Sequence, residues 1–173
     1  MEILVSLAIV AILSAIVVPE IMGRIRESRR SALSQTLFGL TQGISEYKKA
    51  TTRYPFQLSL LTRPPIANTD KDACGTFLSP TNANNWRGPY VSRQLLATGI
   101  PMGDGTIIDA LERTSSTPTY LLMNVTNVDT EIALLLESEL DGAVSNPSTG
   151  TIRYTTPVAG QVTLSYSIPI SGC

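Results

Sequence analysis

Apolar and polar residues follow two different patterns along the first fifty positions. From Ile3 to Val18 the chain holds sixteen residues without a charge, and only Ser6 and Ser14 are polar. After Val18 the large apolar residues recur at helical spacing, at Ile25, Leu33, Leu37, Leu40, Ile44 and Tyr47. Polar residues lie between them, at Arg24, Arg26, Arg29, Arg30, Gln35, Gln42, Glu46 and Lys48. Spacings of three, four and eight residues place such a stripe on one face of a helix.

These patterns predict one long helix over residues 1–52, with two halves. Residues 1–18 are apolar on all sides and are expected to form a transmembrane segment or a filament core, although sixteen residues are slightly fewer than the ~20 that span a bilayer. Residues 19–52 are amphipathic and are expected to dock on a globular head. At ~1.5 Å per residue the whole helix measures on the order of 75 Å. Pro19 predicts a kink, because proline removes one backbone hydrogen bond, and Gly23 weakens the same region.

Three alanines and one glutamate in the first half are candidate contact residues. Ala8, Ala11 and Ala15 form a small-residue face that another helix could approach closely, although ordinary alanine usage explains the same pattern. Glu2 stands directly before the apolar run. It is either an interfacial carboxylate that favours the positive end of the helix or a group kept for a partner charge that arrives when helices bundle. A signal peptide is disfavoured, because no basic segment precedes the run and no small-residue cleavage site follows it.

Residues 53–173 are expected to form the head. Turn residues mark a long irregular connection, at Pro55, Pro64, Pro65, Asn68, Asp70 and Pro80. Thr119–Val125 predicts a buried strand, and Asp129–Gly142 predicts a helix with Asp129 or Thr130 as its cap and Gly142 at its end. Thr151–Thr155 and Val162–Ile168 predict an antiparallel hairpin. Three or four antiparallel strands with one face covered by the second half of the long helix make an α+β fold.

Composition excludes several classes of function. The chain has 13 Lys and Arg, 14 Asp and Glu, and no histidine, for a net charge of -1. This balance argues against nucleic acid as a partner. Without histidine the chain lacks the usual general base and the commonest metal ligand, and no nucleophile–base pair stands out. We therefore expect neither an enzyme nor a cofactor.

Metal and glycan sites are also disfavoured by residue spacing. The acidic residues of the head considered as calcium ligands are Asp104, Asp109, Asp129, Glu131 and Asp141. They lack the spacing of a calcium loop, so no metal is expected. Asn124-Val125-Thr126 fits the glycosylation pattern, but it lies in or beside a predicted strand and is discounted.

The two cysteines, Cys74 and Cys173, are 99 positions apart and form no CxxC motif. One disulfide in an oxidising compartment is the favoured interpretation. Two unpaired buried thiols are the alternative.

The N-terminal segment resembles that of type IV pilins and type II secretion pseudopilins. Mature chains of that family begin Phe-Thr-Leu-(Ile or Met)-Glu, continue through an apolar run, and reach a proline about seventeen residues after the glutamate. Met1 and Glu2 match the last two of those five residues, and Pro19 follows Glu2 by seventeen. The resemblance covers residues 1–50. The family's basic leader and first three mature residues have no counterpart here, so we expect a start upstream of Met1. Trp86–Tyr90 is similar to a Trp-x-Gly-Pro-Tyr segment of some pseudopilins and minor pilins; it forms either an aromatic pair that packs a loop on the core or an exposed contact surface.

The resemblance implies a pilin-like fold and a structural subunit of a homo-oligomeric filament. It implies a single inner-membrane pass with a periplasmic head before assembly, and a cell-surface filament afterwards. A prepilin peptidase that cuts and methylates the N-terminus and an assembly machinery are the implied partners. Glu2 would neutralise the N-terminal amine of a neighbouring subunit, and Cys173 would be tied back to the Cys74 loop. A pilus subunit, a pseudopilin and, from a different class, a monomeric membrane-anchored periplasmic binding domain remain as alternatives.

Overall fold

The computed structural model describes residues 2–97, 99–114, 119–142 and 147–171. For Glu2, Leu4, Val5, Ala8, Ile9, Ile16, Val17 and Pro19 it describes the backbone alone. The helical elements are α1 (Glu2–Thr51), the 3-10 helix η1 (Leu58–Leu61), α2 (Pro80–Asn84) and α3 (Thr130–Asp141). The strands are β1 (Ile100–Pro101), β2 (Ile107–Arg113), β3 (Tyr120–Asp129), β4 (Ile152–Tyr154) and β5 (Gln161–Pro169). The fold is α+β, as the sequence predicted.

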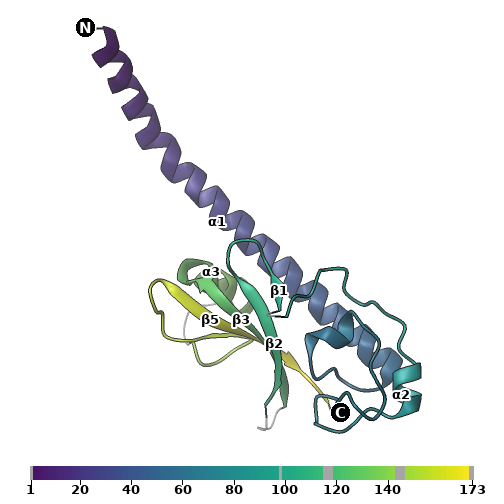
Figure 1. The fold of residues 1–173 in the computed structure, drawn as a ribbon. Coiled ribbons are helices and arrows are strands. Elements are labelled where there is room, and N and C mark those ends of the chain that lie inside the picture. Colours follow the sequence, from purple (N-terminus) through teal and green to yellow (C-terminus); the bar gives the residue numbers. More distant parts are fainter. Residues whose placement is uncertain (1, 98, 115–118, 143–146, 172–173) are drawn as a thin grey trace.

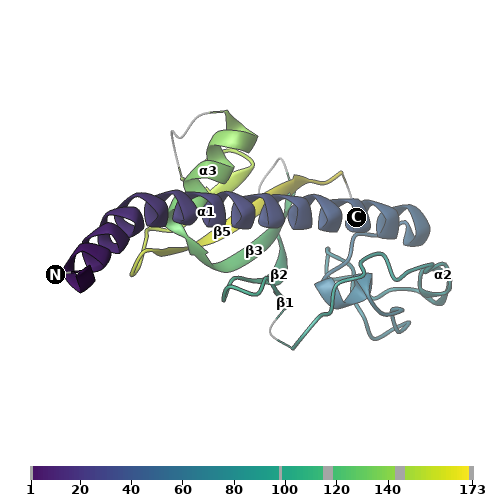
Figure 2. The same cartoon turned by 90° about the horizontal axis from the view of Figure 1, so that it is seen from above.

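Helix α1 is continuous, and its N-terminal part projects far beyond the head (Figure 1). The helix continues without a break through Pro19, and Figure 2 shows its N-terminal part bending away from the line of the rest. From Leu33 to Tyr47 the predicted apolar stripe is buried. Ile25 was expected on the same stripe, but 41% of it is exposed. The prediction is wrong there because the apolar core of the head reaches α1 only near Leu33, and α3 meets the preceding turns through ion pairs at Arg26 and Arg30.

The sheet has five antiparallel strands in the order β1-β2-β3-β5-β4. Strands β3 and β5 form its centre, with Met123 opposite Tyr166 and Val125 opposite Leu164. Figure 2 shows α1 lying across the strands, with α3 beside it. The buried stripe of α1, the inner face of the sheet and Ile132, Ala133 and Leu136 of α3 belong to one hydrophobic core.

Three predicted elements of the head are confirmed. The buried strand is β3, which runs on to Asp129. The predicted helix is α3, where the Asp129 side chain accepts a hydrogen bond from the Glu131 N–H and Gly142 ends the helix at a φ of 79°. A left-handed residue at this position suits glycine, which lacks a Cβ. The hairpin is β4 with β5.

Strands β1 and β2 were not predicted, so the sheet has five strands instead of three or four. The reason lies in the register of β2, which shifts between Ile108 and Ala110. A bulge of this kind breaks the alternation of inward and outward residues. The buried residues of β2, Ile108 and Leu111, are three positions apart. The strand therefore lacks the period of two that identifies strands in a sequence.

A long loop covers the C-terminal end of α1. The Trp86 indole N–H donates to the carbonyl of Leu60 at 3.0 Å. The Tyr90 ring meets the Trp86 ring edge-on at 5.7 Å and the Tyr47 ring of α1 at 5.8 Å. The interpretation of Trp86 and Tyr90 as an aromatic pair that packs a loop on the core is confirmed.

Candidate assembly surface

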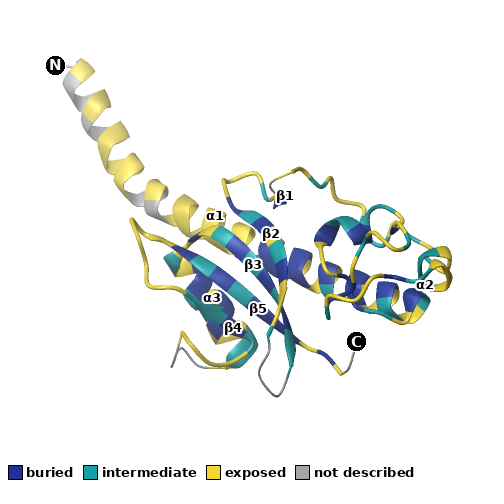
Figure 3. Ribbon diagram, turned by 60° about the horizontal axis from the view of Figure 1, so that its bottom comes forward, coloured by how far each residue is buried: buried dark blue, intermediate teal, exposed yellow. Residues whose placement is uncertain are grey.

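The most unusual surface of the molecule is the projecting half of α1, defined here as residues 2–29. Figure 3 shows the projecting half exposed along its described length, in contrast to the buried positions that begin where the head meets α1. Its large apolar side chains with described exposure are all open to solvent: Ile3, Leu7, Val10, Ile12, Leu13, Val18, Ile21, Met22 and Ile25. Soluble domains rarely expose a contiguous apolar surface of such extent unless it binds something.

The exposed side chains surround the helix instead of forming a single stripe. Each residue turns an α-helix by ~100°, so Ile3 and Ile12, nine residues apart, point to opposite sides. Ile3 is 77% exposed and Ile12 is 62% exposed. A helix that is apolar on all sides is normally surrounded by other apolar groups. One partner lying along one face would therefore leave much of this surface uncovered.

The structure places the predicted contact residues on this half. Ala11 and Ala15 are both exposed, one helical turn apart. The side chains of Glu2, Ala8 and Pro19 lie outside the described residues, so their contacts stay predictions. Sequence reasoning assigned residues after Val18 to the docked half and thereby missed Ile21, Met22 and Ile25 as part of the exposed surface. Arg24, which follows Met22 by two positions, was assigned to the polar face of a docked helix.

The predicted single pass through an inner membrane is wrong. Among the helices of the described residues, none is long and apolar enough to cross a membrane. Ile3–Val18 forms about 24 Å of helix at ~1.5 Å per residue, whereas the hydrocarbon core is ~30 Å thick. Extending the segment towards the head adds Glu20 and Arg24. The predicted location, which depended on this membrane anchor, is corrected with it.

Ion pairs join α1 to the head where the projecting half ends. Arg26 lies 2.5 Å from Glu131 of α3, and Arg30 pairs with Glu139 of α3 and, at 2.5 Å, with Glu27. The hydrogen bond from Arg30 lowers the pKa of the Glu27 carboxyl, and the same bond raises the pKa of Arg30. These pairs are partly exposed, so they orient α1 more than they stabilise it.

Four of the acidic residues weighed as possible metal ligands have other partners, namely Asp104, Asp129, Glu131 and Asp141. Asp104 accepts from the Thr106 N–H, Asp129 caps α3, and Asp141 accepts from the N–H groups of Thr151 and Ile152. Burial alone would raise the pKa of Asp141, but the two backbone hydrogen bonds outweigh it and hold the pKa below the ordinary value. Within the described part of the chain no three or more metal-ligating side chains gather.

The structure also describes the discounted glycosylation motif and one of the two cysteines. Asn124 lies in β3, where its side chain accepts from the Ser165 hydroxyl at 2.8 Å. Cys74 is disulfide-bonded. Cys173 lies outside the described residues, so the pairing of Cys74 with Cys173 stays a prediction.

Comparison with known proteins adds no relative. No protein-family model matches the chain, no curated protein matches its sequence, and no solved structure matches its fold. The function is therefore inferred from the residues and geometry of the chain itself.

Proposed function

We propose that this protein is the structural subunit of a type IV pilin-like filament, in which the projecting halves of many copies pack together. The observation that carries the proposal is the all-round exposure of large apolar side chains along residues 3–25. The head supplies no cover for them, and a second copy of the same helix supplies apolar surface of matching length.

A comparison of the free energy of side-chain burial with the free-energy cost of association favours assembly through several neighbours. Fully burying one Val, Leu or Ile side chain yields ~1.5–3 kcal/mol. Association costs an estimated ~4–15 kcal/mol in lost translational and rotational freedom. A single neighbour that covers three or four of these side chains would barely offset that cost. Several neighbours that cover the whole circumference exceed it, so the contact becomes stable only in a larger assembly.

The geometry favours an open filament over a closed dimer. Contacts around the whole circumference of one helix require different faces to meet different neighbours. Such head-to-tail interfaces give helical filaments when the rotation between copies does not close a ring. Helices pack with axes ~8–10 Å apart, so the slender projecting halves can gather in a core that excludes the heads.

The α+β head on the second half of α1 and the resemblance over residues 1–50 support a pilin-like subunit. Pilus subunits and pseudopilins both fit this proposal, because both build filaments from such helices. The membrane-anchored binding domain is not retained, since it required the anchor corrected above.

A matched pair of valines tests the proposal. Val10 on the projecting half is 59% exposed, and Val158 on the loop between β4 and β5 is 75% exposed. The purified full chain and the variants Val10→Asp and Val158→Asp would be compared by sedimentation velocity and negative-stain electron microscopy over a range of concentrations. We expect elongated polymers from the wild type and from Val158→Asp, and monomers from Val10→Asp, because a buried unpaired carboxylate is costly.

Fluorescence of Trp86, the single tryptophan, would report whether each variant keeps its folded head. A wild type that stays monomeric at every concentration, or a Val10→Asp variant that polymerises like the wild type, would overturn the proposal.

A further inference from the structure

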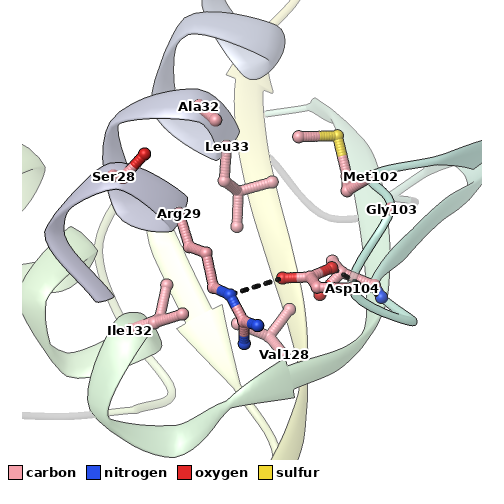
Figure 4. A pocket seen from close by; sticks show the side chains of 10 residues that line it. Ser28, Arg29, Ala32, Leu33, Met102, Gly103, Asp104, Val128 and Ile132 are labelled. Atoms are coloured by element: carbon pink, nitrogen blue, oxygen red, sulfur yellow. Dashed lines mark hydrogen bonds and ion pairs between the residues drawn. The ribbon is translucent and has the colours of Figure 1, made fainter. Parts of the chain in front are cut away.

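A pocket lies where α1 enters the head, between α1, α3 and the loop that joins β1 to β2. Figure 4 shows Leu33, Val128 and Ile132 around it, and all three are buried apolar residues. Met102 and Asp104 of the loop form the opposite wall, and Arg29 reaches across the opening. The cavity measures about 280 Å³, enough for a small group of aliphatic atoms.

Arg29 differs from the two neighbouring arginines that bind the head. Arg26 and Arg30 form short ion pairs with α3. Arg29 Nε lies 3.9 Å from Oδ2 of Asp104, beyond hydrogen-bond distance. The other oxygen of Asp104 accepts from the Thr106 N–H at 3.0 Å. Half of the Arg29 side chain is exposed, and a guanidinium has five donors, so it can bind a further carboxylate while Asp104 stays in place.

The pocket therefore combines an apolar floor with a cation at its mouth. The complementary ligand is an aliphatic group that carries one carboxylate beside it. The chain contains such a segment at residues 2–5, where Glu2 precedes Ile3, Leu4 and Val5, and no further charged side chain occurs before Glu20. Because α1 is a continuous helix, that end cannot fold back onto its own Arg29. It has to come from another molecule.

The pocket opens on the side of α1 where other copies are proposed to gather. Ile21, Ile25 and Arg29 follow one another at intervals of four residues, and Ala32 comes three residues later. These intervals keep them on one face of the helix, and all but Arg29 are apolar and exposed. The mouth of the pocket therefore lies on an exposed face of α1.

We propose that the pocket receives the N-terminal end of a second copy of this chain, with Glu2 of that copy paired to Arg29. The inference rests on the proposed function in that its partner is another subunit. It also differs from the pairing that the family resemblance implies, in which Glu2 binds an N-terminal amine. The pair of Glu2 and Arg29 mainly fixes the offset between neighbouring helices along their axes, because apolar packing alone allows the helices to slide along one another.

The contact predicts a distance along the filament. Glu2 and Arg29 are 27 positions apart, which is about 40 Å at ~1.5 Å per residue. If all copies point the same way, two subunits joined by this contact are offset by that distance. A whole number of subunit steps along the filament axis should therefore equal about 40 Å in a helical reconstruction.

Exchange of the two charges tests the contact directly. The full chain would be compared with Arg29→Glu, with Glu2→Arg, with the double variant, and with Arg113→Glu as the control. Arg113 is an exposed arginine at the end of β2, outside the projecting half, and it does not line the pocket. Each single exchange places like charges together, so we expect the critical concentration for assembly to rise at least ~10-fold. The double variant should return to within about threefold of the wild type, and Arg113→Glu should assemble normally.

A photo-crosslinking residue in place of Met102 gives a second measurement that does not depend on charge. In mixtures of isotopically labelled and unlabelled copies, we expect intermolecular crosslinks to residues 2–7. Crosslinks that map elsewhere, a single exchange that assembles at the wild-type concentration, a double variant no better than its worse parent, or an equal loss in Arg113→Glu would each overturn the inference.

The outcomes separate this inference from the proposed function. If the wild type forms filaments but the double variant does not recover assembly, the proposed filament function stands and the Glu2–Arg29 contact is refuted. If closed dimers form and the double variant recovers fully, the Glu2–Arg29 contact stands and the filament function is refuted. If the wild type does not assemble at all, both proposals are refuted.

Discussion

The two halves of α1 contain the same kinds of aliphatic side chain in opposite surroundings. Leu37 in the second half is 1% exposed, whereas Leu13 in the first half is 57% exposed. The second half is covered by the sheet, by α3 and by the long loop, and it belongs to the core of the head. The first half has no such cover in its own molecule. The comparison teaches that an apolar helix segment can remain uncovered in its own molecule, and we propose that another copy covers the first half.

The boundary between the halves is set by the head instead of by the helix. Pro19 and Gly23 were expected to kink or weaken one long helix, and α1 is continuous through both. Exposure ends only near Arg30, where the α3 ion pairs and the apolar contacts of Leu33 begin. The projecting half is therefore about ten residues longer than the apolar run alone predicts.

The largest expected effect comes from two leucines of the same helix. Leu37→Ala should lower the free energy of unfolding of the head by about 2–5 kcal/mol, because it leaves a cavity in the core. Leu13→Ala should change that free energy by less than about 0.5 kcal/mol, because its side chain is exposed in the single molecule. Urea unfolding followed by Trp86 fluorescence, below the concentration of assembly, measures both. Equal effects would show that the two halves do not differ in burial.

The next largest effect on the free energy of unfolding is expected from alanine substitutions at the glycines of α1. A Cβ added at Gly43 would lie 2.9 Å from Val91 Cγ2 and 3.1 Å from the Tyr90 carbonyl oxygen, whereas nothing lies within 4 Å of a Cβ at Gly39 or Gly23. Gly43→Ala should therefore destabilise the head by about 1–3 kcal/mol through overpacking. Gly39→Ala and Gly23→Ala should stabilise the helix by up to ~1 kcal/mol. Changes of opposite sign in the free energy of unfolding, measured by the same urea unfolding, would confirm that only the second half of α1 is tightly packed. A Gly43→Ala variant with unchanged stability would contradict this.

Acid should loosen the loop that covers the second half. Arg63 Nη1 and Nη2 donate to Asp70 at 2.7 and 2.9 Å, and these bonds, helped by the Ile66 N–H and opposed by partial burial, lower the pKa of Asp70. Because the folded pKa lies below the unfolded value of ~3.9, the stability from this carboxylate is complete above that pH and is lost as pH falls through the folded pKa.

The variant Asp70→Asn isolates this contribution. It should cost about 1 kcal/mol near neutral pH, since the amide keeps an acceptor oxygen but loses the charge. Its stability should also fall less steeply than that of the wild type when unfolding is measured from pH 6 down to pH 2. Parallel pH curves for the two proteins would rule out the assigned role of Asp70.

The smallest effect is expected at the boundary itself. Arg26→Gln removes a half-exposed ion pair with Glu131, so it should cost at most ~1 kcal/mol. The difference from the wild type should shrink further in 1 M salt, where the screening length is ~3 Å. A loss larger than that of Leu37→Ala would show that charges, and not apolar packing, hold α1 on the head.

Sequence reasoning succeeded where the controlling interactions are local. The cap of Asp129, the left-handed Gly142 and the alternation in β5 involve neighbours within a few positions, and each was predicted with nearly correct bounds. It failed at β2, where a bulge disrupts the alternation. It failed also at Ile25, whose spacing matches the buried stripe although the head does not reach it.

Some parts of the candidate assembly surface could likewise be predicted from the sequence, and others could not. The apolar run and Glu2 are visible in the sequence, because an uncharged stretch next to a carboxylate needs no structure to be recognised. The pocket beside Arg29 could not be predicted, because it is built from α1, the loop after β1, β3 and α3. Positions 29, 104 and 132 lie far apart in the chain, and only the packing of these elements brings them together.

The sequence by itself determined that α1 is one long helix, that its first half is apolar on all sides, and that the head is α+β. These properties depend on backbone hydrogen bonds four residues apart and on short-range periodicity. Tertiary structure alone decided where α1 meets the head, which aliphatic side chains remain exposed, and which arginine lies at the mouth of a pocket. Burial depends on distant segments that arrive from elsewhere in the chain, and a local pattern contains no record of how far they reach.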